Sequence, residues 1–486
     1  MSDKETALAP IRFGTDGWRA VIAEDFTFAN LERVAQAYAD YLQQSNITDA
    51  SPDASNNSAA SLVIIGYDRR FLSEQFALRA AEVLAGNELR IALFNEAVPT
   101  PVVSWAVKLN NALGGVVITA SHNPADFNGF KIKAPWGGSA SPEITSIVES
   151  LVDAQSPRRR KSSAASDERA MLEASIESYR AQVASYIDLE RLKSAQMSVV
   201  VDPMHGAGGR WVESFLQGGA LQTETIRADR DPLFGGVNPE PIDRNLAALM
   251  SRVKETNAGL GLATDGDADR VGAVNERGET MTMHEVVPLI LLHLARERKM
   301  TGGVVRTFSQ SVLTKRIAQA HNLKLHDTPI GFKYIADLML KEDILMGAEE
   351  SGGIGVKGHI PERDGILNCL LLLEAVVTSG KSPSEMVKEM HREFGEFYFG
   401  RRDLHCEVRR GQELVMKLAS QPPGAVAGHA VVGVETLDGT KLLFEDESWL
   451  LFRQSGTEPA LRVYSEATSV DKMNALLAEG EQLAIK

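Results

Sequence analysis

Residues 114–124 read GGVVITASHNP, a short run of apolar, mostly β-branched residues that ends abruptly in a polar loop containing Ser121. The pattern recurs in four other segments: SLVIIGYDRR (61–70), MSVVVDPMHGAGG (197–209), AGLGLATDGDADR (258–270) and GGVVRTFSQS (302–311). Amphipathic stretches such as Arg79–Ala85 and Val312–Ala320 alternate with these runs. The alternation predicts βαβ units with mainly parallel or mixed sheets, whose functional loops lie at the carboxyl ends of the strands.

After about residue 395 the alternation of apolar runs and amphipathic stretches gives way to short strand-like runs joined by turns. An antiparallel hairpin system and a closing helix are expected there: Val431–Glu435, the turn Asp438-Gly439, Lys441–Phe444, Trp449–Phe452 and the helix Ser469–Ala484. This predicts a smaller α+β domain at the C-terminus. Two stretches look like breaks. Residues 44–61 are expected to be a surface insertion, and residues 156–166, which carry four consecutive basic residues, an interdomain linker.

The composition limits the classes of protein to consider. A chain of 486 residues with 44% hydrophobic residues is too long for one core and predicts several domains. The formal net charge of −14 disfavours nucleic acids and anionic membranes as partners, so an anionic ligand would need locally concentrated positive charge. The N-terminus has no apolar signal region and no apolar run is long enough to cross a membrane, so we expect a cytoplasmic protein. The two cysteines indicate no disulfide framework.

Three aspartates, Asp265, Asp267 and Asp269, alternate along a loop directly after an apolar run. Such carboxylates can converge on one hard cation and leave positions open for water and phosphate, which favours magnesium. The next residue, Arg270, can pair with a phosphate oxygen. An acidic turn or a calcium loop is the alternative, but an EF-hand would need Glu276 to lie between two helices, and here it follows a strand-like run.

Ser121 lies in a loop with glycine, asparagine and proline, where tight backbone geometry can present a hydroxyl group. A neutral serine is a weak nucleophile that needs a base, a metal or prior phosphorylation. His122 and Lys131 are nearby groups that can move protons. Taken alone, a loop serine more often caps a helix.

Two later motifs offer groups that bind phosphate and sugar. Arg453 to Pro459, together with Arg462, supplies guanidinium and hydroxyl donors around a glycine, as a phosphate site requires, although an exposed turn is equally compatible. Gly347 to Gly353 places two carboxylates and a hydroxyl between glycines, which suits vicinal sugar hydroxyls, a helix cap or a second metal site. The glycine-rich stretch at 205–211 does not predict dinucleotide binding, because Trp211 occupies the place of the third glycine.

Together these motifs resemble the α-D-phosphohexomutases, the family of phosphoglucomutase and phosphomannomutase. The resemblance covers nearly the full chain, with the motifs in the expected order: Phe13–Arg19, Thr119–Pro124, Asp265–Arg270, Glu349–Gly353 and Arg453–Pro459. It implies four domains around a central cleft, three related α/β domains with mixed sheets and a C-terminal α+β domain. We place the domains at residues 1–160, 161–275, 276–394 and 395–486.

The resemblance also implies roles for individual residues. Ser121 would be the phosphoserine, which holds Mg²⁺ with the three aspartates, while Arg19, Lys131 and Arg270 would surround the transferring phosphoryl group. The residues expected to bind the substrate are Thr328, Gly331, Lys333, Glu349 and Ser351 at the sugar, and Arg453, Ser455, Gly456, Thr457 and Arg462 at the distal phosphate. One departure is Arg363, where phosphoglucomutases carry lysine. Because arginine is a poor proton carrier, proton transfer is expected to fall on Lys131 or His122.

The implied activity is a hexose-phosphate mutase that interconverts hexose 1-phosphate and hexose 6-phosphate, with glucose 1,6-bisphosphate as intermediate and activator. The sequence favours glucose phosphates and leaves mannose and glucosamine phosphates open. A metal-dependent sugar phosphatase and a catalytically silent sugar-phosphate sensor are the alternatives from other classes. The expected partners are small hexose phosphates, with neither nucleic acid nor membrane, and the protein is expected to be a monomer or a homodimer.

Overall fold

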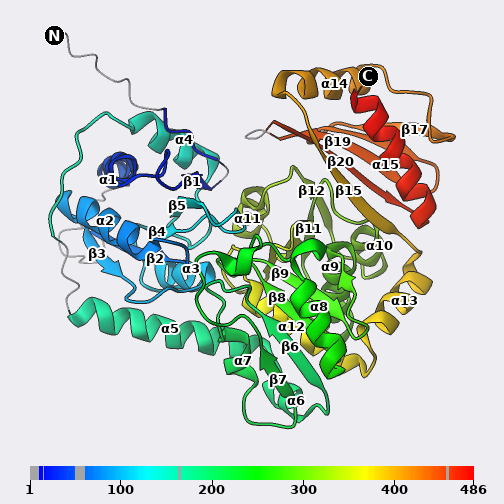
Figure 1. Ribbon diagram of the computed structural model, residues 1–486, viewed down its shortest axis with the longest axis horizontal. Coiled ribbons are helices and arrows are strands. Elements are labelled where there is room, and N and C mark those ends of the chain that lie inside the picture. The colour runs from blue at the N-terminus through cyan, green and yellow to red at the C-terminus, as the bar shows by residue number, and fades with distance from the viewer. Residues whose placement is uncertain (1–9, 15, 50–60, 162–165, 456–458, 486) are drawn as a thin grey trace. The chain divides into compact units, whose positions relative to one another are not determined.

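The computed structural model describes residues 10–14, 16–49, 61–161, 166–455 and 459–485. The chain forms two compact units (Figure 1). Unit 1 contains residues 1–272 and 358–370, and unit 2 contains residues 273–357 and 371–486.

The first sheet of unit 1 has five strands in the order β1-β5-β4-β2-β3. Its strands are β1 (Gly17–Val21), β2 (Leu62–Tyr67), β3 (Arg90–Leu93), β4 (Gly114–Ile118) and β5 (Phe127–Lys133). β2 runs parallel to β3 and β4, whereas β5 runs antiparallel to β1 and β4, so the sheet is mixed. Every residue of β2 and β4 is buried, as expected for strands that are covered on both faces.

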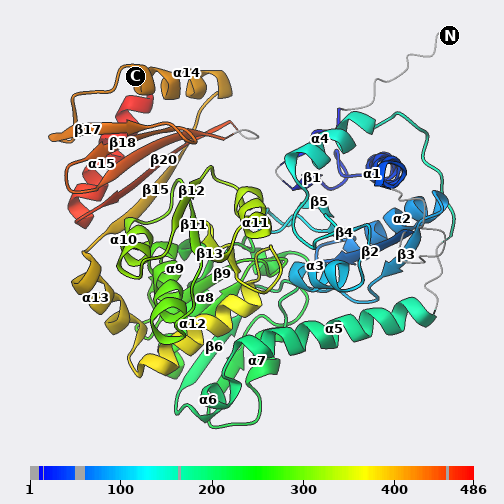
Figure 2. The ribbon, with the colours of Figure 1, turned by 180° about the vertical axis from the view of Figure 1, so that it is seen from behind.

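Six helices in the described part of unit 1 lie between the strands of this sheet in the chain or follow them. They are α1 (Phe28–Asp49), α2 (Ser73–Gly86), α3 (Thr100–Leu109), α4 (Pro142–Leu151), α5 (Ser166–Tyr186) and α6 (Leu189–Ser194). The long helix α5 packs against α3 and β3, as both views show (Figures 1 and 2). The predicted break at residue 44 is wrong at its start, because α1 continues to Asp49, and residues 50–60 lie outside the described residues. In the predicted linker, residues 156–166, Arg159 forms ion pairs with Glu32 and Glu82, which hold the basic part of this segment against α1 and α2.

A second set of strands in unit 1 carries the triple-aspartate loop. β6 (Ser198–Asp202) pairs in parallel with both β7 (Gln222–Thr225) and β8 (Leu260–Thr264). The helices here are α7 (Trp211–Leu216), η2 (Phe234–Gly236), η3 (Asp243–Asn245) and α8 (Ala247–Thr256). β9 (Val271–Asn275) then carries the chain from unit 1 into unit 2 and pairs antiparallel with β10 (Thr280–Met281).

Unit 2 contains a four-stranded mixed sheet in the order β12-β11-β13-β14. The strands are β11 (Gly303–Thr307), β12 (Leu325–Thr328), β13 (Ile344–Ala348) and β14 (Ile354–Val356). The helices of this part are α9 (Met283–Leu292), η4 (His293–Glu297), α10 (Val312–Ala320), α11 (Phe332–Lys341) and α13 (Pro383–Phe394). A further helix, α12 (Gly365–Ser379), begins in unit 1 and continues into unit 2. The strand predicted at residues 260–264 and the helix predicted at Val312–Ala320 are confirmed with the expected bounds, and the apolar start of the segment 302–311 forms β11.

The last sheet has six strands in the order β15-β20-β19-β18-β17-β16, and every pairing in it is antiparallel. Its strands are β15 (Tyr398–His405), β16 (Ala425–Val426), β17 (His429–Glu435), β18 (Thr440–Phe444), β19 (Trp449–Gln454) and β20 (Ala460–Ala467). α14 (Val408–Ser420) and α15 (Val470–Ile485) pack on it. The predicted C-terminal α+β domain is therefore confirmed, as is the α/β character of the three preceding sheets.

One buried carboxylate joins the last sheet to the rest of unit 2. Glu466 of β20 is fully buried and accepts hydrogen bonds from the Ser311 hydroxyl, the Val312 amide and the Trp449 indole, at 2.6, 2.8 and 3.0 Å. His284 Nδ1 lies 3.0 Å from the same carboxylate. These donors come from α9, from the start of α10 and from β19, so one side chain fixes the sheet against two helices.

Within the described residues, no single helix is long and apolar enough to cross a membrane. Taken together, α12 and α13 reach that length and apolarity, but the chain bends by 80° between them. The leucines of α12 are buried inside the protein itself.

Candidate active site in unit 1

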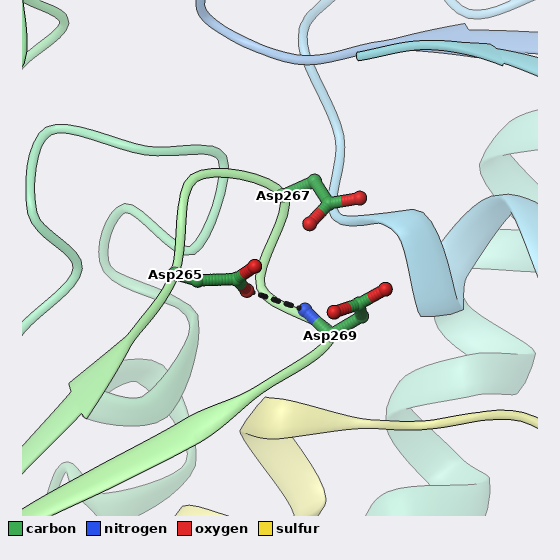
Figure 3. Close-up of side chains that lie close together, drawn as sticks. All are labelled: Asp265, Asp267 and Asp269. Atoms are coloured by element: carbon green, nitrogen blue, oxygen red, sulfur yellow. Dashed lines mark hydrogen bonds between the residues drawn. The ribbon is translucent and has the colours of Figure 1, made fainter. Parts of the chain in front are cut away.

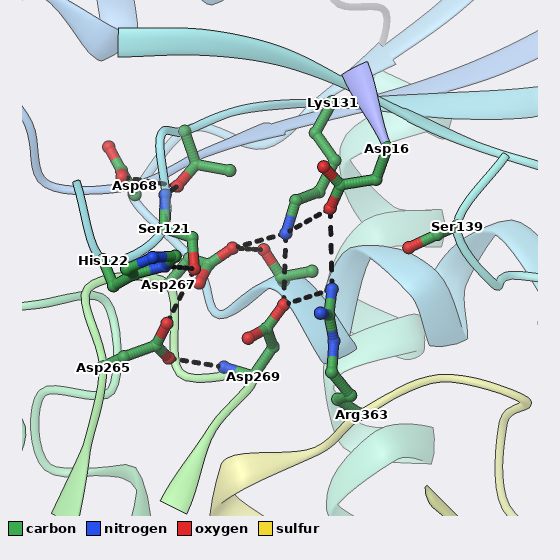
Figure 4. Close-up of polar contacts among 12 residues, drawn as sticks. Asp16, Asp68, Ser121, His122, Lys131, Ser139, Asp265, Asp267, Asp269 and Arg363 are labelled. Atoms are coloured by element: carbon green, nitrogen blue, oxygen red, sulfur yellow. Dashed lines mark hydrogen bonds and ion pairs between the residues drawn. The ribbon is translucent and has the colours of Figure 1, made fainter. Parts of the chain in front are cut away.

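Ser121 follows β4 in a backbone conformation that few non-glycine residues adopt. Its φ angle is 51°, in the left-handed region, and its residue surface is 1% exposed. The Ser121 amide donates a hydrogen bond of 2.9 Å to Thr119 Oγ1. The Ser121 hydroxyl donates a hydrogen bond of 2.8 Å to Asp265 Oδ2 (Figure 4). The loop after β4 therefore presents the serine oxygen directly to the triple-aspartate loop.

Asp265, Asp267 and Asp269 lie in the turn between β8 and β9, and all three are fully buried (Figure 3). One carboxylate oxygen from each lies within 4.8 Å of the others. Asp265 Oδ1 stabilises the turn by accepting hydrogen bonds from the amides of Asp269 and Arg270, at 3.0 and 3.1 Å. Gly266 permits the close approach of the serine loop, since a Cβ there would lie 2.4 Å from the Ser121 carbonyl oxygen.

The donor set of this turn fits a hard divalent cation. Asp267 Oδ1 and Asp269 Oδ1 are buried and accept no hydrogen bond from any described residue. Burial, together with the charges of Asp267 and Asp269, raises the pKa of Asp265 well above its usual value. Three carboxylates in a dry site repel one another, and oxygen ligands with open positions suit Mg²⁺.

Lys131 of β5 faces the same carboxylates. Its ammonium lies 3.0 Å from Asp267 Oδ2, 3.1 Å from Asp269 Oδ2 and 3.4 Å from Asp16 Oδ2. Burial alone would lower the pKa of Lys131, but the carboxylates outweigh burial and raise it. Lys131 is therefore a cation in this arrangement, suited to stabilising negative charge that develops beside Ser121.

Arg363 also reaches the aspartates, from the loop before α12. Its Nη2 lies 2.9 Å from Asp269 Oδ2 and 3.5 Å from Asp16 Oδ2. From the sequence alone, Arg363 was noted only as a departure from the family pattern, and no role was predicted for Asp16. The signal for Asp16 was its position inside the motif at residues 13–19, and the signal for Arg363 was its place where phosphoglucomutases carry lysine.

His122, Arg19 and Arg270 lie at the edges of this cluster. His122 Nδ1 is 3.5 Å from the Ser121 hydroxyl oxygen, and burial with the nearby charges of Arg270 and Arg19 lowers the pKa of His122 well below its usual value. Arg19 donates to Asn123 Oδ1 at 2.9 Å and pairs with Asp16 at 3.1 Å. Arg270 Nε lies 4.0 Å from Asp265 and 3.9 Å from Asp269. The structure thus brings together all the residues expected around the transferring phosphoryl group.

The predicted sugar-binding residues all belong to unit 2. Thr328 ends β12, Gly331 precedes α11 and Lys333 lies in its first turn, while Glu349 and Ser351 lie in the turn between β13 and β14. The Glu349 amide donates to the Gly353 carbonyl oxygen at 2.9 Å, which closes that turn.

The predicted phosphate-binding residues lie on the last sheet of unit 2. Arg453 belongs to β19 and Arg462 to β20, where the two are direct cross-strand partners. Their side chains therefore share one face of the sheet. Ser455 follows β19, and its amide donates to the Ala460 carbonyl oxygen at 2.9 Å. Gly456 and Thr457 lie outside the described residues.

Asp438 links the predicted sugar and phosphate residues of unit 2. Its Oδ2 atom accepts hydrogen bonds from the Ile330 amide at 2.8 Å and from Arg453 Nε at 2.9 Å. The sequence pattern predicts only a hairpin turn at Asp438. Its partner Ile330 is 108 residues away in the chain, a separation that leaves no local signal.

Comparison with protein families gives matches along nearly the whole chain. Residues 10–159, 177–278 and 283–394 match the α/β/α domains I, II and III of phosphoglucomutase/phosphomannomutase, and residues 408–482 match its C-terminal domain. A phosphoglucomutase/phosphomannomutase of Thermococcus kodakarensis is 31% identical over 97% of this chain and 98% of its own. A phosphoglucosamine/phosphogalactosamine mutase of Sulfurisphaera tokodaii is 26% identical over 96% of this chain and 97% of its own.

The fold agrees with these sequence matches. The crystal structure of a candidate phosphomannomutase from Thermus thermophilus has a TM-score of 0.83 and 37% identity, covering 98% of this chain and 100% of its own. Three findings agree: the four family domains in sequence order, a full-length relative above 30% identity, and this structural match. The chain belongs to the phosphoglucomutase/phosphomannomutase family.

Proposed function

We propose that this hexose-phosphate mutase works through a phosphorylated Ser121 and prefers the pair α-D-glucose 1-phosphate and glucose 6-phosphate. The observation that carries the proposal is the 2.8 Å hydrogen bond from the Ser121 hydroxyl to Asp265, inside a buried turn of three carboxylates. A serine oxygen beside a site for a divalent cation and beside Lys131 has the neighbours that phosphoryl transfer requires.

In the proposed cycle, phosphoserine gives its phosphoryl group to the free hydroxyl of a hexose monophosphate. The bond from phosphorus to Ser121 Oγ breaks as a bond from phosphorus to the sugar oxygen forms, which leaves a bound hexose 1,6-bisphosphate. The proton of the attacking hydroxyl passes to the serine oxygen through Lys131 or His122. The bisphosphate then turns end for end, and Ser121 takes back the phosphoryl group from the other end. Free glucose 1,6-bisphosphate would activate the enzyme by phosphorylating Ser121.

Asp265, Asp267 and Asp269 would hold Mg²⁺ together with an oxygen of the serine phosphate. The ion would neutralise charge on the phosphoryl oxygens during transfer. Arg19 and Arg270 would pair with the same phosphoryl group, and Lys131 and Arg363 already carry positive charge into the cluster.

In unit 2, we assign sugar recognition to Thr328, Gly331, Lys333, Glu349 and Ser351. We assign the phosphate that is not being transferred to Arg453, Ser455, Gly456, Thr457 and Arg462. With domain boundaries at residues 160, 275 and 394, the serine loop, the metal loop, the sugar-binding residues and the phosphate-binding residues would each lie in a separate domain. We further propose a cytoplasmic monomer or homodimer that acts on free sugar phosphates, with neither nucleic acid nor membrane as a partner.

The test is to give the purified protein α-D-glucose 1-phosphate, Mg²⁺ and a trace of glucose 1,6-bisphosphate. Formation of glucose 6-phosphate without release of inorganic phosphate is the expected result, whereas stoichiometric inorganic phosphate would instead identify a phosphatase. Comparison of kcat/KM for the 1-phosphates of glucose, mannose and glucosamine then tests the sugar. A higher value for mannose or glucosamine would overturn the preference for glucose.

A further inference from the structure

Arg70 lies in the loop that follows β2, and its side chain is fully buried beneath the Ser121 loop. Its Nη1 donates to the carbonyl oxygens of Pro124 and Phe127, at 2.6 and 3.1 Å. Its Nη2 donates to the carbonyl oxygens of Ser121 and Asn123, both at 2.7 Å. One guanidinium group therefore binds four carbonyl oxygens of the segment that carries the reactive serine.

Asp68 completes this arrangement from the same loop. Its Oδ2 lies 3.1 Å from Arg70 Nε and accepts a hydrogen bond of 2.7 Å from the Thr119 hydroxyl. Thr119 Oγ1 in turn accepts the Ser121 amide at 2.9 Å. The backbone amide and the backbone carbonyl of Ser121 are thus both tied to the pair Asp68–Arg70.

Ser121 needs such support because its backbone is in an unfavourable conformation. A non-glycine residue in the left-handed region is strained and persists only where its surroundings hold it there. Convergent carbonyl oxygens also repel one another unless a donor lies between them, and guanidinium has five donors in a fixed planar fork. The phenyl ring of Phe234, 4.9 Å from the Arg70 guanidinium carbon, covers the group from the other side.

We propose that the buried pair Asp68–Arg70 is a positioning device for Ser121, which holds the serine loop in the one conformation that aims Oγ at Asp265 and the cation site. Both side chains are fully buried and make their contacts with the loop, so the pair acts through the loop. This inference rests on the proposed function, since it assigns Ser121 as the group whose position matters.

Replacing Arg70 by lysine tests the proposal, because an ammonium retains the charge but cannot bind four carbonyl oxygens at once. The matched control is Arg33→Lys in the same sheet's helix α1. Arg33 is also a buried arginine that binds one carboxylate with two nitrogens, that of Asp153, and neither residue belongs to the site. For each variant we would measure kcat, KM, the thermal midpoint and the rate at which glucose 1,6-bisphosphate phosphorylates the protein, by intact mass.

Displacement of a reacting atom by about 1 Å can cost about 10²-fold in rate, so kcat and the phosphorylation rate of Arg70→Lys should fall by about that factor. KM should change less than about threefold, because the groups proposed to bind sugar and distal phosphate are untouched. Arg33→Lys should also lower the thermal midpoint but keep kcat within about twofold of wild type. Equal kcat for the two variants, per folded molecule, would overturn the proposal.

Thr119→Val decides the question if Arg70→Lys does not fold. This nearly isosteric change removes only the hydroxyl that links Asp68 to the Ser121 amide, and it should reduce kcat at least about tenfold with KM unchanged. Wild-type kcat in Thr119→Val would refute the positioning role. Wild-type protein assayed alongside separates the two ideas: an inactive wild type contradicts the proposed function, whereas an active wild type with unaffected variants contradicts only the positioning role.

Discussion

Ser121 Oγ lies 2.8 Å from Asp265 Oδ2, although 144 residues separate the two in the chain. The loop after β4 and the loop after β8 each present a side chain at the carboxyl end of a strand, the usual place for functional groups in α/β sheets. Contact between these two loops turns an ordinary loop serine into a candidate phosphoryl carrier.

Removal of divalent metal should abolish turnover and lower thermal stability. The two carboxylate oxygens of Asp267 and Asp269 that accept no hydrogen bond from the described residues should bind the cation, which also relieves repulsion among the three carboxylates. Mg²⁺ at about 100 times its Kd should add about 2.7 kcal/mol of stability. After EDTA treatment, addition of Mg²⁺ should raise the thermal midpoint and restore activity. Asp267→Asn should weaken both responses, and an undiminished response in that variant would place the metal elsewhere.

Asp438→Asn should weaken substrate binding in unit 2. The asparagine keeps one oxygen but loses the charge that holds both Arg453 Nε and the Ile330 amide. A hydrogen bond to a charged group contributes about 1.5 kcal/mol or more, so KM for the hexose phosphate should rise about tenfold. Asp446→Asn is the control, because Asp446 lies in another turn of the same sheet and binds Lys472 and Thr468. An equal rise of KM in both variants would contradict a specific role for Asp438.

Lys441→Met should stabilise unit 2 near neutral pH. Lys441 is buried between Phe308 and Trp449, with its ammonium 4.0 and 4.8 Å from the ring centroids. Burial, with the positive charge of Arg306, lowers the pKa of Lys441 to about 8.

The direction of the pH dependence follows from proton binding. Between pH 8 and the pKa of a free lysine, about 10.4, the unfolded chain binds a proton that the folded chain does not, so stability from this group rises with pH. The substitution should therefore raise the thermal midpoint at pH 7 by removing a cost of up to about 3 kcal/mol, with a smaller gain near pH 10. A gain that is independent of pH would show that the ammonium is not destabilised by burial.

The sequence predicted the strands and the loops that follow them because apolar runs of four to six residues are a local signal. β8 begins and ends where expected, and α15 is shifted by a single residue from its predicted range. The edge strand β15 was missed because its residues Tyr398–His405 are partly or fully exposed and include three charged side chains, which hides its pairing with β20.

Contacts between distant parts of the chain could not be predicted in the same way. Asp16 and Arg363 lie 3.5 Å apart although 347 residues separate them in the chain. Arg70 ends the segment SLVIIGYDRR (61–70), but that pattern does not predict its hydrogen bonds to the serine loop. Which carbonyl oxygens a buried arginine binds depends on the packing of three loops, and no spacing in the sequence encodes that. The resemblance to a known family singled out Ser121 and the three aspartates, whereas the structure shows which groups contact them.

The most direct test of the account is the mass of the intact protein after brief incubation with glucose 1,6-bisphosphate and Mg²⁺. Wild type should gain the mass of one phosphoryl group, and peptide mapping should place it on Ser121. If that group carries an isotopic label, excess unlabelled glucose 1-phosphate should move the label into sugar phosphate at a rate no slower than kcat. Ser121→Ala should gain no mass and lose nearly all mutase activity. Phosphate on another residue, or full turnover by Ser121→Ala, would contradict the account.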